Sequence, residues 1–319
     1  MHLLIPFASA LSEPAAEVVR DLALPTLARL LQRLSAAEHQ SGDHDDQADE
    51  YTLSPPHERA LAQAWGWPLI DGGLPFAARA AAADGINVAD KAWGLLTPAH
   101  WDVGRDHVTL SDPQALGLSE DESRALFDAV RGLFESEGFA LAWGAPTRWY
   151  AAHDSLAEQR CASLDRVIGR NVDLWLRGDP QAGASARLLR RLQSEVQLLL
   201  YPHAINEARE DRGAMTINSF WLSGCGRHRA ATATAVQVDE SLRGPLFMQD
   251  WAAWADAWRA LDAGPLGRLL ASLDRGGKVA LTLCGERHAQ RFEHRPRSLL
   301  QKVQQRWSAP QPAAVLEAL

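Results

Sequence analysis

Cysteine is scarce in this chain of 319 residues, which contains only Cys161, Cys225 and Cys284. Their odd number and wide spacing argue against a disulfide framework and fit a reducing compartment. The sequence also has no basic-then-apolar signal at its start and no apolar run near the roughly 20 residues that span a bilayer. We therefore expect a cytoplasmic protein without a membrane segment.

An excess of positive charge is absent as well. The chain has 32 Lys and Arg against 40 Asp and Glu, a net charge of −8, and five of the acids lie in residues 41–50. A nearly neutral remainder lacks the electrostatic surface of a general nucleic-acid or membrane binder. Residues 40–51 are acidic and almost free of apolar side chains, which predicts a mobile loop. His39 and His44, near the aspartates of this loop, are candidate ligands for a metal ion. The alternative is a solvated loop that binds no metal.

Several common catalytic motifs are missing. There is no Gly-x-Ser-x-Gly elbow, no Gly-x4-Gly-Lys-Ser/Thr loop and no Gly-x-Gly-x-x-Gly after a strand. One local basic segment, residues 286–306, has six Lys and Arg against two Glu. A solvated helix face explains this segment, and a nucleic-acid accessory role is the alternative.

Strands and helices alternate along the chain. The expected strands are 3–7, 139–143, 172–176, 216–222, 232–238 and 278–284. The expected helices are 14–34, either as one helix or as a pair broken at Pro25, and 120–136, 184–200, 249–261 and 265–272. This order predicts an α/β fold, with a layered, mostly parallel sheet and helices on both faces. We expect one large α/β domain over 1–319, with a subdomain at 111–176.

Tryptophan is abundant, with twelve residues, and three of them share one helical stripe. Trp251, Trp254 and Trp258 fall at i, i+3 and i+7, so they must face an apolar surface. We expect the stripe to lie in the core, and a homodimer contact is the alternative.

The stretch from Pro202 to Gly226 carries polar residues at fixed spacing. His203, Asn206 and Arg209 fall at i, i+3 and i+6 of an expected helix with Pro202 in its first turn, so they share one face. An imidazole, an amide and a guanidinium together suit a phosphate or carboxylate. A capped helix with a surface ion pair explains the same residues without a ligand.

The residues after this helix complete the candidate site. Gly213 is expected to end the helix, and Gly224-Cys225-Gly226 is expected to turn the chain sharply after a strand. The predicted anion pocket consists of His203, Asn206, Arg209, Asn218, Trp221, Arg227 and His228.

These residues carry a family resemblance. The chain reads His203-Ala-Ile-Asn206-Glu-Ala-Arg209, then Gly213, then Asn218-Ser219-Phe-Trp221-Leu-Ser-Gly224-Cys-Gly226. This pattern resembles the signature of archaeal-type cofactor-independent phosphoglycerate mutases, of the alkaline-phosphatase superfamily. Together with Pro98-Ala-His100-Trp101-Asp102-Val-Gly104-Arg-Asp106-His107, it is also similar to RpfE-type regulatory proteins. The resemblance implies a mutase-like α/β fold.

The mutase resemblance also implies a two-metal site of aspartates and histidines at strand ends, beside a Ser or Thr nucleophile. Phe7 stands where the first Asp is expected, and Cys284-Gly285 where Asp-His is expected, while Asp239-Glu240 is the nearest remnant of the middle motif. A metal site with these losses is implausible. Cys284 with His288 and His294 is a weak candidate for a different, single-metal site.

We therefore predict a non-catalytic, phosphoglycerate-mutase-like regulatory or binding protein with a degenerate metal site and no cofactor. Its partner would be an unidentified protein, or a small ligand that bears a phosphate or carboxylate. The first alternative is a phosphomutase or phosphatase acting on phosphorylated small molecules, with His203, Arg209, Arg227 and His228 working without a metal. The second alternative, a nucleic-acid accessory protein, is disfavoured by the acidic balance.

Overall fold

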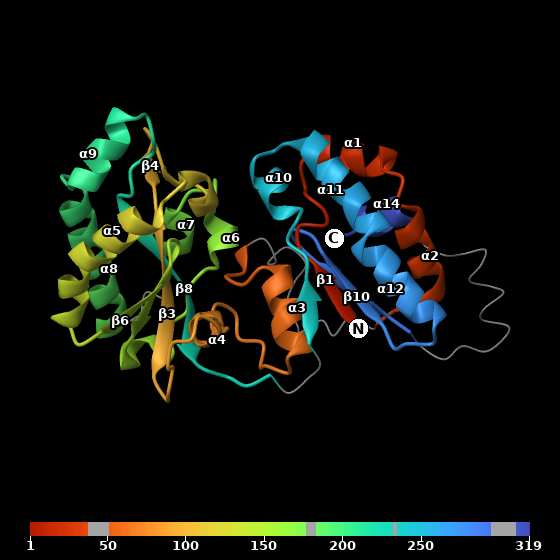
Figure 1. Cartoon of the computed structure of the whole chain (residues 1–319), viewed down its shortest axis with the longest axis horizontal. Coiled ribbons are helices and arrows are strands. Elements are labelled where there is room, and N and C mark those ends of the chain that lie inside the picture. Colours follow the sequence, from red (N-terminus) through yellow and green to blue (C-terminus); the bar gives the residue numbers. More distant parts are fainter. Residues whose placement is uncertain (38–50, 177–182, 232–234, 295–310) are drawn as a thin grey trace. The chain divides into compact units, whose positions relative to one another are not determined.

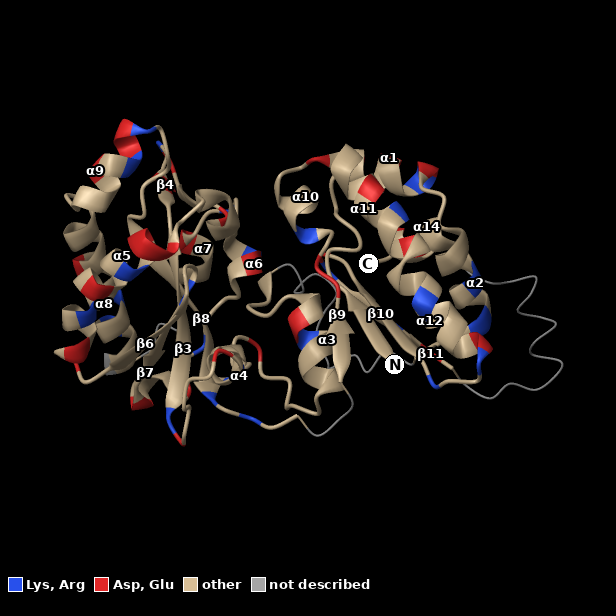
Figure 2. Cartoon of the chain, viewed as in Figure 1, with Lys and Arg blue, Asp and Glu red and all other residues tan. Residues whose placement is uncertain are grey.

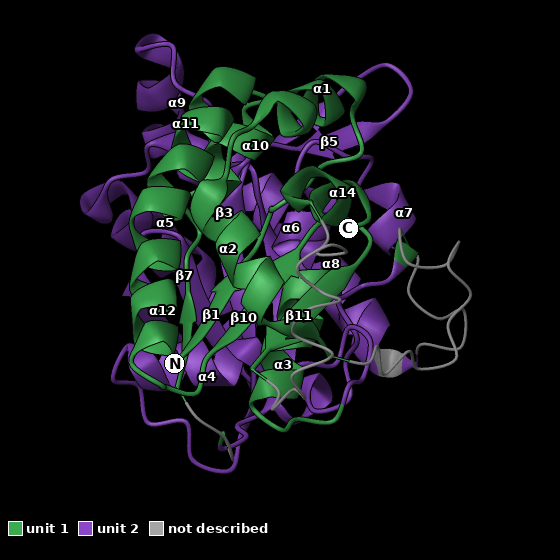
Figure 3. Ribbon diagram, turned by 90° about the vertical axis from the view of Figure 1, so that its right-hand side faces the viewer, with its two compact units in different colours: residues 1–51, 55–68, 231–319 green, residues 52–54, 69–230 purple. Residues whose placement is uncertain are grey.

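The computed structural model describes residues 1–37, 51–176, 183–231, 235–294 and 311–319. The chain groups into two compact units, which Figure 3 colours separately: unit 1 consists of Met1–Tyr51, Pro55–Pro68 and Ala231–Leu319, and unit 2 of Thr52–Ser54 and Leu69–Ala230. The predicted subdomain at 111–176 lies within unit 2. The one-domain prediction for 1–319 stays a prediction. Residues 40–50 of the acidic loop, with His39 and His44, lie outside the described residues.

Unit 1 contains a five-stranded sheet in the order β2-β11-β10-β1-β9. The strands are β1 (His2–Ile5), β2 (Ser35–Ala36), β9 (Val236–Val238), β10 (Ala280–Cys284) and β11 (Ala289–Glu293). β1 runs parallel to β10 and β9, whereas β11 is antiparallel to both β10 and β2. Every residue of β1 and β10 is buried, as expected for strands covered on both faces.

Helices cover both faces of this sheet (Figure 1). One face carries α1 (Glu13–Asp21), α2 (Pro25–Arg33), α11 (Trp251–Ala263), α12 (Pro265–Asp274) and α14 (Pro312–Glu317), and the other carries α3 (Pro56–Ala64). A short helix, α10 (Arg243–Phe247), precedes α11. Of the two alternatives for 14–34, the structure shows the broken pair: α1 ends at Asp21 and Pro25 begins α2.

The tryptophan stripe lies in the core of unit 1, as predicted. Trp254 and Trp258 are 0% exposed, and Trp251 is partly buried against the same cluster. Their rings meet edge to face, with centroids 6.2 Å apart in each successive pair. This packing holds α11 against the sheet.

Unit 2 contains a four-stranded sheet in the order β6-β7-β3-β8. The strands are β3 (Ala92–Ala99), β6 (Ala140–Ala145), β7 (Arg148–Ala152) and β8 (Ser219–Arg227), and a separate hairpin pairs β4 (Trp101–Val103) with β5 (Val108–Leu110). In Figure 1, α5 (Glu120–Glu135) and α8 (Ala184–Leu200) cover one face of the sheet, and α4 (Phe76–Ala83) covers the other. The short helices α6 (Leu164–Val167), α7 (Asp173–Leu176) and α9 (Ala204–Asp211) complete the unit.

The α/β prediction is confirmed, but a mostly parallel sheet is not what the chain forms. Every strand pair in unit 2 is antiparallel, and unit 1 has a mixed sheet. The connections give the reason. Two residues join β6 to β7 and four join β10 to β11, and a parallel pair needs a crossover of a dozen residues or more.

Two sequence predictions about β8 are wrong. The strand begins at Ser219 rather than at Thr216, and it continues to Arg227 instead of turning at Gly224-Cys225-Gly226. Trp93 pairs with Gly226 and Leu95 with Ser223, so two residues of β8 oppose one residue of β3. The glycines serve this bulge and the close approach of α4: Gly224 has φ of 63°, and a Cβ there would lie 2.8 Å from the Ala77 amide nitrogen.

The strand predicted at Val172–Leu176 is also wrong. Residues 173–176 form α7, and the Asn171 side chain accepts a hydrogen bond from the Asp173 amide at 3.0 Å. This local capping bond favours a helical turn over an extended chain. The remaining predicted helices are present with ends shifted by at most two residues. None of the described helices is both long enough and apolar enough to cross a membrane.

Candidate functional site

The predicted polar helix is α9, and His203 caps it. His203 precedes the first turn, and its Nδ1 accepts a hydrogen bond from the Ile205 amide at 3.2 Å. The helix therefore begins at Ala204, which corrects the expectation that Pro202 would lie in the first turn. Gly213, with φ of 72°, follows the last turn as predicted.

Asn206 and Asn218 hold the chain that leads into β8. The Asn206 Nδ2 donates to the carbonyls of Leu200 and Ile217 at 2.8 Å each, and its Oδ1 accepts from the Ile217 amide at 2.8 Å. Asn218 makes a similar pair of bonds with the backbone of Trp101, at 2.8 and 2.9 Å. These side-chain bonds fix the chain just beyond the end of the β3–β8 ladder, where the Asn218 amide donates to the Ala99 carbonyl at 3.1 Å.

Arg209 is completely buried, with 0% of its surface exposed. Its Nε donates to the Met215 carbonyl at 2.7 Å, Nη1 pairs with Glu122 Oε2 at 3.0 Å, and Nη2 donates to the Leu116 carbonyl. The guanidinium thus joins α9, α5 and the turn before α5. A bound anion would have to displace these bonds.

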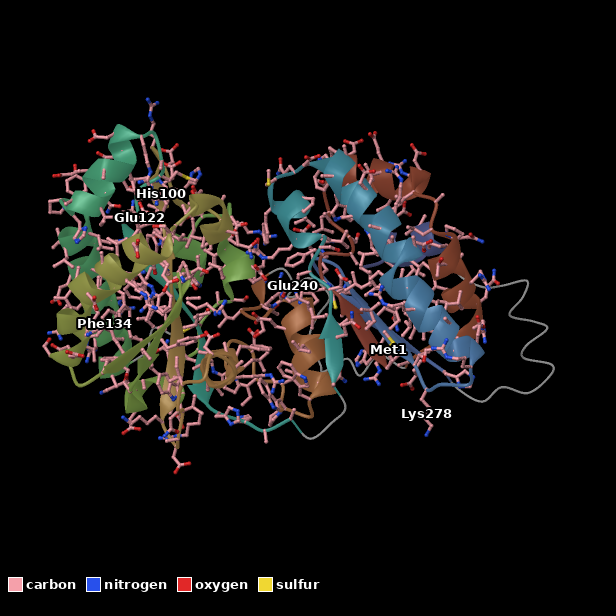
Figure 4. All side chains as sticks on the ribbon, in the orientation of Figure 1. Met1, His100, Glu122, Phe134, Glu240 and Lys278 are labelled. Carbon is pink, nitrogen blue, oxygen red and sulfur yellow. The ribbon has the colours of Figure 1, made fainter. Side chains whose placement is uncertain are left out.

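Glu122, labelled in Figure 4, is the acid of this network. Its other oxygen pairs with Arg212, and with Ser119 it forms a capping box at the start of α5. Burial opposes its ionisation, yet the hydrogen bonds from Arg212 and Ser119 and the charge of Arg209 lower its pKa to about 2. Glu122 is therefore a carboxylate at neutral pH.

Arg227 and His228 lie at the opposite end of β8 from Asn218, roughly 30 Å away along a strand that rises about 3.3 Å per residue. Arg227 pairs with Asp154 at 3.1 Å and donates to the Asp90 carbonyl, and His228 is exposed. The structure brings Asn206, Arg209 and Asn218 to one end of the strand and leaves Arg227 and His228 at the other. Anion binding by all seven residues stays a prediction.

Trp221, the remaining member, lines a cavity of about 430 Å³ in unit 2. Residues 220–222 of β8 form one wall and residues 158–162 another, while α8 contributes Ala186 and Leu189. The Trp221 indole donates to the Ala162 carbonyl at 2.9 Å and so ties the two walls together. The volume is in the range of small-molecule sites.

The cavity combines an apolar interior with charged residues at its edge. Phe220, Trp221 and Trp175 are buried aromatic residues of its lining, whereas Arg160 and Arg190 are exposed lining residues. Glu158 is the acidic residue among the described lining residues, so the lining carries a net positive charge. Sequence reasoning named only Trp221 of this set as a site residue; Phe220 lies in the same motif, and the others lie in segments without a recognisable motif.

The predicted metal-ligand positions lie at the carboxyl ends of β1 and β10. Phe7 is 9% exposed, and its ring centroid lies 4.9 Å from that of His57 and 5.4 Å from that of Phe247. Its carbonyl accepts a hydrogen bond from the Trp254 indole at 3.2 Å. An aromatic cluster therefore occupies this strand end.

The end of β10 is closed in a similar way. Cys284 is fully buried, and burial raises the pKa of its thiol, so it stays neutral. A Cβ at Gly285 would lie 2.6 Å from the Leu319 Cβ, which leaves no room for a histidine there. Cys284 pairs with Ala289 at one end of the β10–β11 hairpin, whereas the His294 amide bonds to Val279 at the other.

That separation prevents Cys284, His288 and His294 from meeting. Within the described residues, no group of three His, Cys, Asp or Glu side chains is placed to hold a metal ion.

Asp239, the nearest remnant of the middle metal motif, directly follows β9. Its amide donates to the Leu4 carbonyl, and its carboxylate accepts a hydrogen bond from the Ser241 amide at 3.2 Å.

Comparisons with known proteins return only distant structural likeness. No family model and no curated protein matches the chain. A cofactor-independent phosphoglycerate mutase from Thermoplasma acidophilum is 13% identical, with a TM-score of 0.37, over 92% of this chain and 88% of its own. The PH0037 protein from Pyrococcus horikoshii is 11% identical, with a TM-score of 0.42, over 92% and 86%. At these values neither family membership nor an activity follows, and the RpfE-type resemblance stays a prediction.

Proposed function

We propose that this chain is a non-catalytic, phosphoglycerate-mutase-like binding protein that holds a small carboxylate- or phosphate-bearing molecule in the cavity beside Trp221. The observation that carries the proposal is the pairing of an aromatic cavity interior with two arginines in the lining. Aromatic rings bind the apolar body of a ligand, and guanidinium groups bind planar or tetrahedral oxyanions. A regulatory role would follow if ligand binding controlled a protein partner.

The absence of catalysis is proposed from what fills the strand ends. Two-metal phosphoryl transfer needs several anionic or imidazole ligands beside a nucleophile. Phe7 and the neutral, buried Cys284 supply none, and Leu319 occupies the space beside Gly285. The metal-free phosphomutase alternative needs a guanidinium free to meet substrate, whereas that of Arg209 is bonded to Met215, Glu122 and Leu116.

The nucleic-acid alternative has no specific support. Its basic segment lies largely in residues 295–310, outside the described residues. On α5, α8 and α9, basic and acidic residues are interspersed (Figure 2). A phosphate backbone would need a surface of one sign.

Binding is tested by calorimetry with naphthalene-2-carboxylate and 2-naphthyl phosphate as probes. Ala186→Trp fills the cavity and should abolish binding, whereas Arg187→Trp, on the exposed side of the same helix, should not. Arg190→Gln should weaken binding about fivefold, since an exposed charge pair contributes about 1 kcal/mol, and Arg187→Gln is its control. If neither Ala186→Trp nor Arg190→Gln changed the affinity for the probes, the proposed binding site would be refuted.

Catalysis is tested separately. We expect no turnover of 3-phosphoglycerate or p-nitrophenyl phosphate, with or without manganese. Phe7→Asp should restore neither activity nor manganese binding, because one carboxylate does not make a two-metal site. Metal-dependent turnover by the natural chain would show that it is an enzyme and would overturn the non-catalytic assignment.

A further inference from the structure

Two of the three cysteines meet beside the cavity, which Cys161 lines and behind which Cys225 is buried. The Sγ atoms of Cys161 and Cys225 lie 3.6 Å apart, although 64 residues separate them in the sequence, and both are free thiols. We propose that this pair is a modification site: hydrogen peroxide, or another small peroxide, converts it into an intramolecular disulfide. The wide spacing of the cysteines in the sequence argued against a disulfide framework, but the fold brings the sulfur atoms of this pair close together.

The sheet holds Cys225 in place. Cys225 lies in the bulge of β8, opposite Gly94 of β3, and is 1% exposed. A Cβ at Gly94 would lie 3.1 Å from the Cys225 Sγ, so the missing side chain of Gly94 gives the thiol its space. The neighbouring strand thus limits where this sulfur can go.

The backbone around Cys161 is fixed at three successive residues. The Cys161 amide donates to the Gly72 carbonyl at 3.0 Å, the Ala162 carbonyl accepts from Trp221, and the Ser163 amide donates to the Leu53 carbonyl at 2.9 Å. A disulfide needs an S–S distance of about 2.05 Å. The closure therefore requires an approach of about 1.5 Å, which rotation of the two side chains can supply.

The two thiols differ in access, which sets the order of the reaction. Cys161 is partly exposed and lines the cavity, so peroxide reaches it first. Cys225 is buried, and its hydrogen bond with Cys161, together with burial, raises its pKa. It therefore stays protonated until the second step.

The chemistry balances with one peroxide. The Cys161 sulfur attacks one peroxide oxygen, the O–O bond breaks, and the leaving hydroxide takes the thiol proton to form water. The Cys161 sulfenic acid that results is attacked by the Cys225 sulfur, the S–S bond forms, and the hydroxyl leaves with the Cys225 proton as a second water. Two thiols are oxidised and one hydrogen peroxide is reduced to two waters; with an alkyl hydroperoxide the first leaving group takes the thiol proton to form an alcohol instead of water.

The experiment treats the full chain with hydrogen peroxide and then alkylates it in denaturant. We expect the number of alkylatable thiols to fall from three to one, with a monomer mass lower by two hydrogen atoms before alkylation and a peptide linking Cys161 to Cys225. A reductant should restore all three thiols. Cys284→Ser should form the same link, because Cys284 is buried elsewhere.

Two variants keep the result interpretable. Cys161→Ser and Cys225→Ala should each abolish the link, and circular dichroism before oxidation checks that both remain folded. A link that involves Cys284, a link between two molecules, or oxidation of Cys161 to the sulfinic acid with Cys225 still free would overturn the proposal. The reaction needs no ligand, so failure of the cavity-binding experiment would leave this one intact.

Discussion

The role of Arg209 is decided by replacing it with alanine. Its guanidinium is 0% exposed and bonded to Met215, Glu122 and Leu116. If Arg209 acts in packing, Arg209→Ala should strongly reduce the free energy of unfolding. If it acts in anion binding, the substitution should change ligand affinity more than stability.

The magnitude follows from what the substitution leaves behind. Removing one partner of a buried ion pair costs about 3 to 5 kcal/mol, because the other charge loses its compensation. Glu122 keeps Arg212 and Ser119, and it is not completely buried, with 13% of its side chain exposed. We therefore expect the lower end, about 3 kcal/mol.

The assay is urea unfolding of the full chain, followed both by far-UV circular dichroism and by hydrogen exchange of amides in α5 and α9. A chain with two compact units can unfold in more than one transition, so hydrogen exchange is used to assign the loss of stability to unit 2. Arg212→Ala is the matched control: it removes the other cation on Glu122, but Arg212 is 50% exposed, and we expect a loss of about 1 kcal/mol or less. Equal, small losses for both variants would refute a packing role for Arg209.

Three further predictions concern other parts of the fold. Trp254→Ala should lower the free energy of urea unfolding by about 3 to 5 kcal/mol and leave the sedimentation coefficient unchanged, because this tryptophan lies in the core of unit 1. A shift toward lighter species in sedimentation would favour the homodimer alternative. Because the pKa of Glu122 is lowered from 4.5 to about 2 in the folded chain, its carboxylate stabilises the fold fully above pH 4.5 and progressively less as the pH falls toward about 2. Glu122→Gln should therefore reduce the loss of unfolding free energy measured between these two pH values, and an unchanged slope would contradict this. Gly224→Ala should destabilise the chain more than Gly85→Ala in thermal unfolding, since both have positive φ but only Gly224 faces a backbone nitrogen at 2.8 Å; equal effects would mean that α4 moves away freely.

Local signals in the sequence were enough for many elements. Pro25 separates α1 from α2, Gly213 follows the end of α9, and the spacing of Trp254 and Trp258 predicted their burial. Each of these depends on residues within one or two turns of helix, and such neighbours are fixed by the backbone itself. β3 was missed because its sequence, AWGLLTPA, holds a glycine and a proline and lacks alternation, although all but one of its residues are buried.

The direction of the strands and the membership of the sites depend on contacts between distant residues. Arg209 meets Glu122 across 87 residues, Cys161 meets Cys225 across 64, and the cavity gathers β8, α8, α7 and the segment at 158–162. Nothing in the local pattern of these segments encodes such pairings, because they arise only when the sheet and its helices pack against each other and bury their apolar faces. The sequence alone therefore determined the ends of α5, α8, α11 and α12 to within two residues and the buried face of α11, whereas α7 was expected as a strand. The tertiary structure decided that Arg209 and Asn206 bind the protein's own backbone while Trp221 lines a cavity.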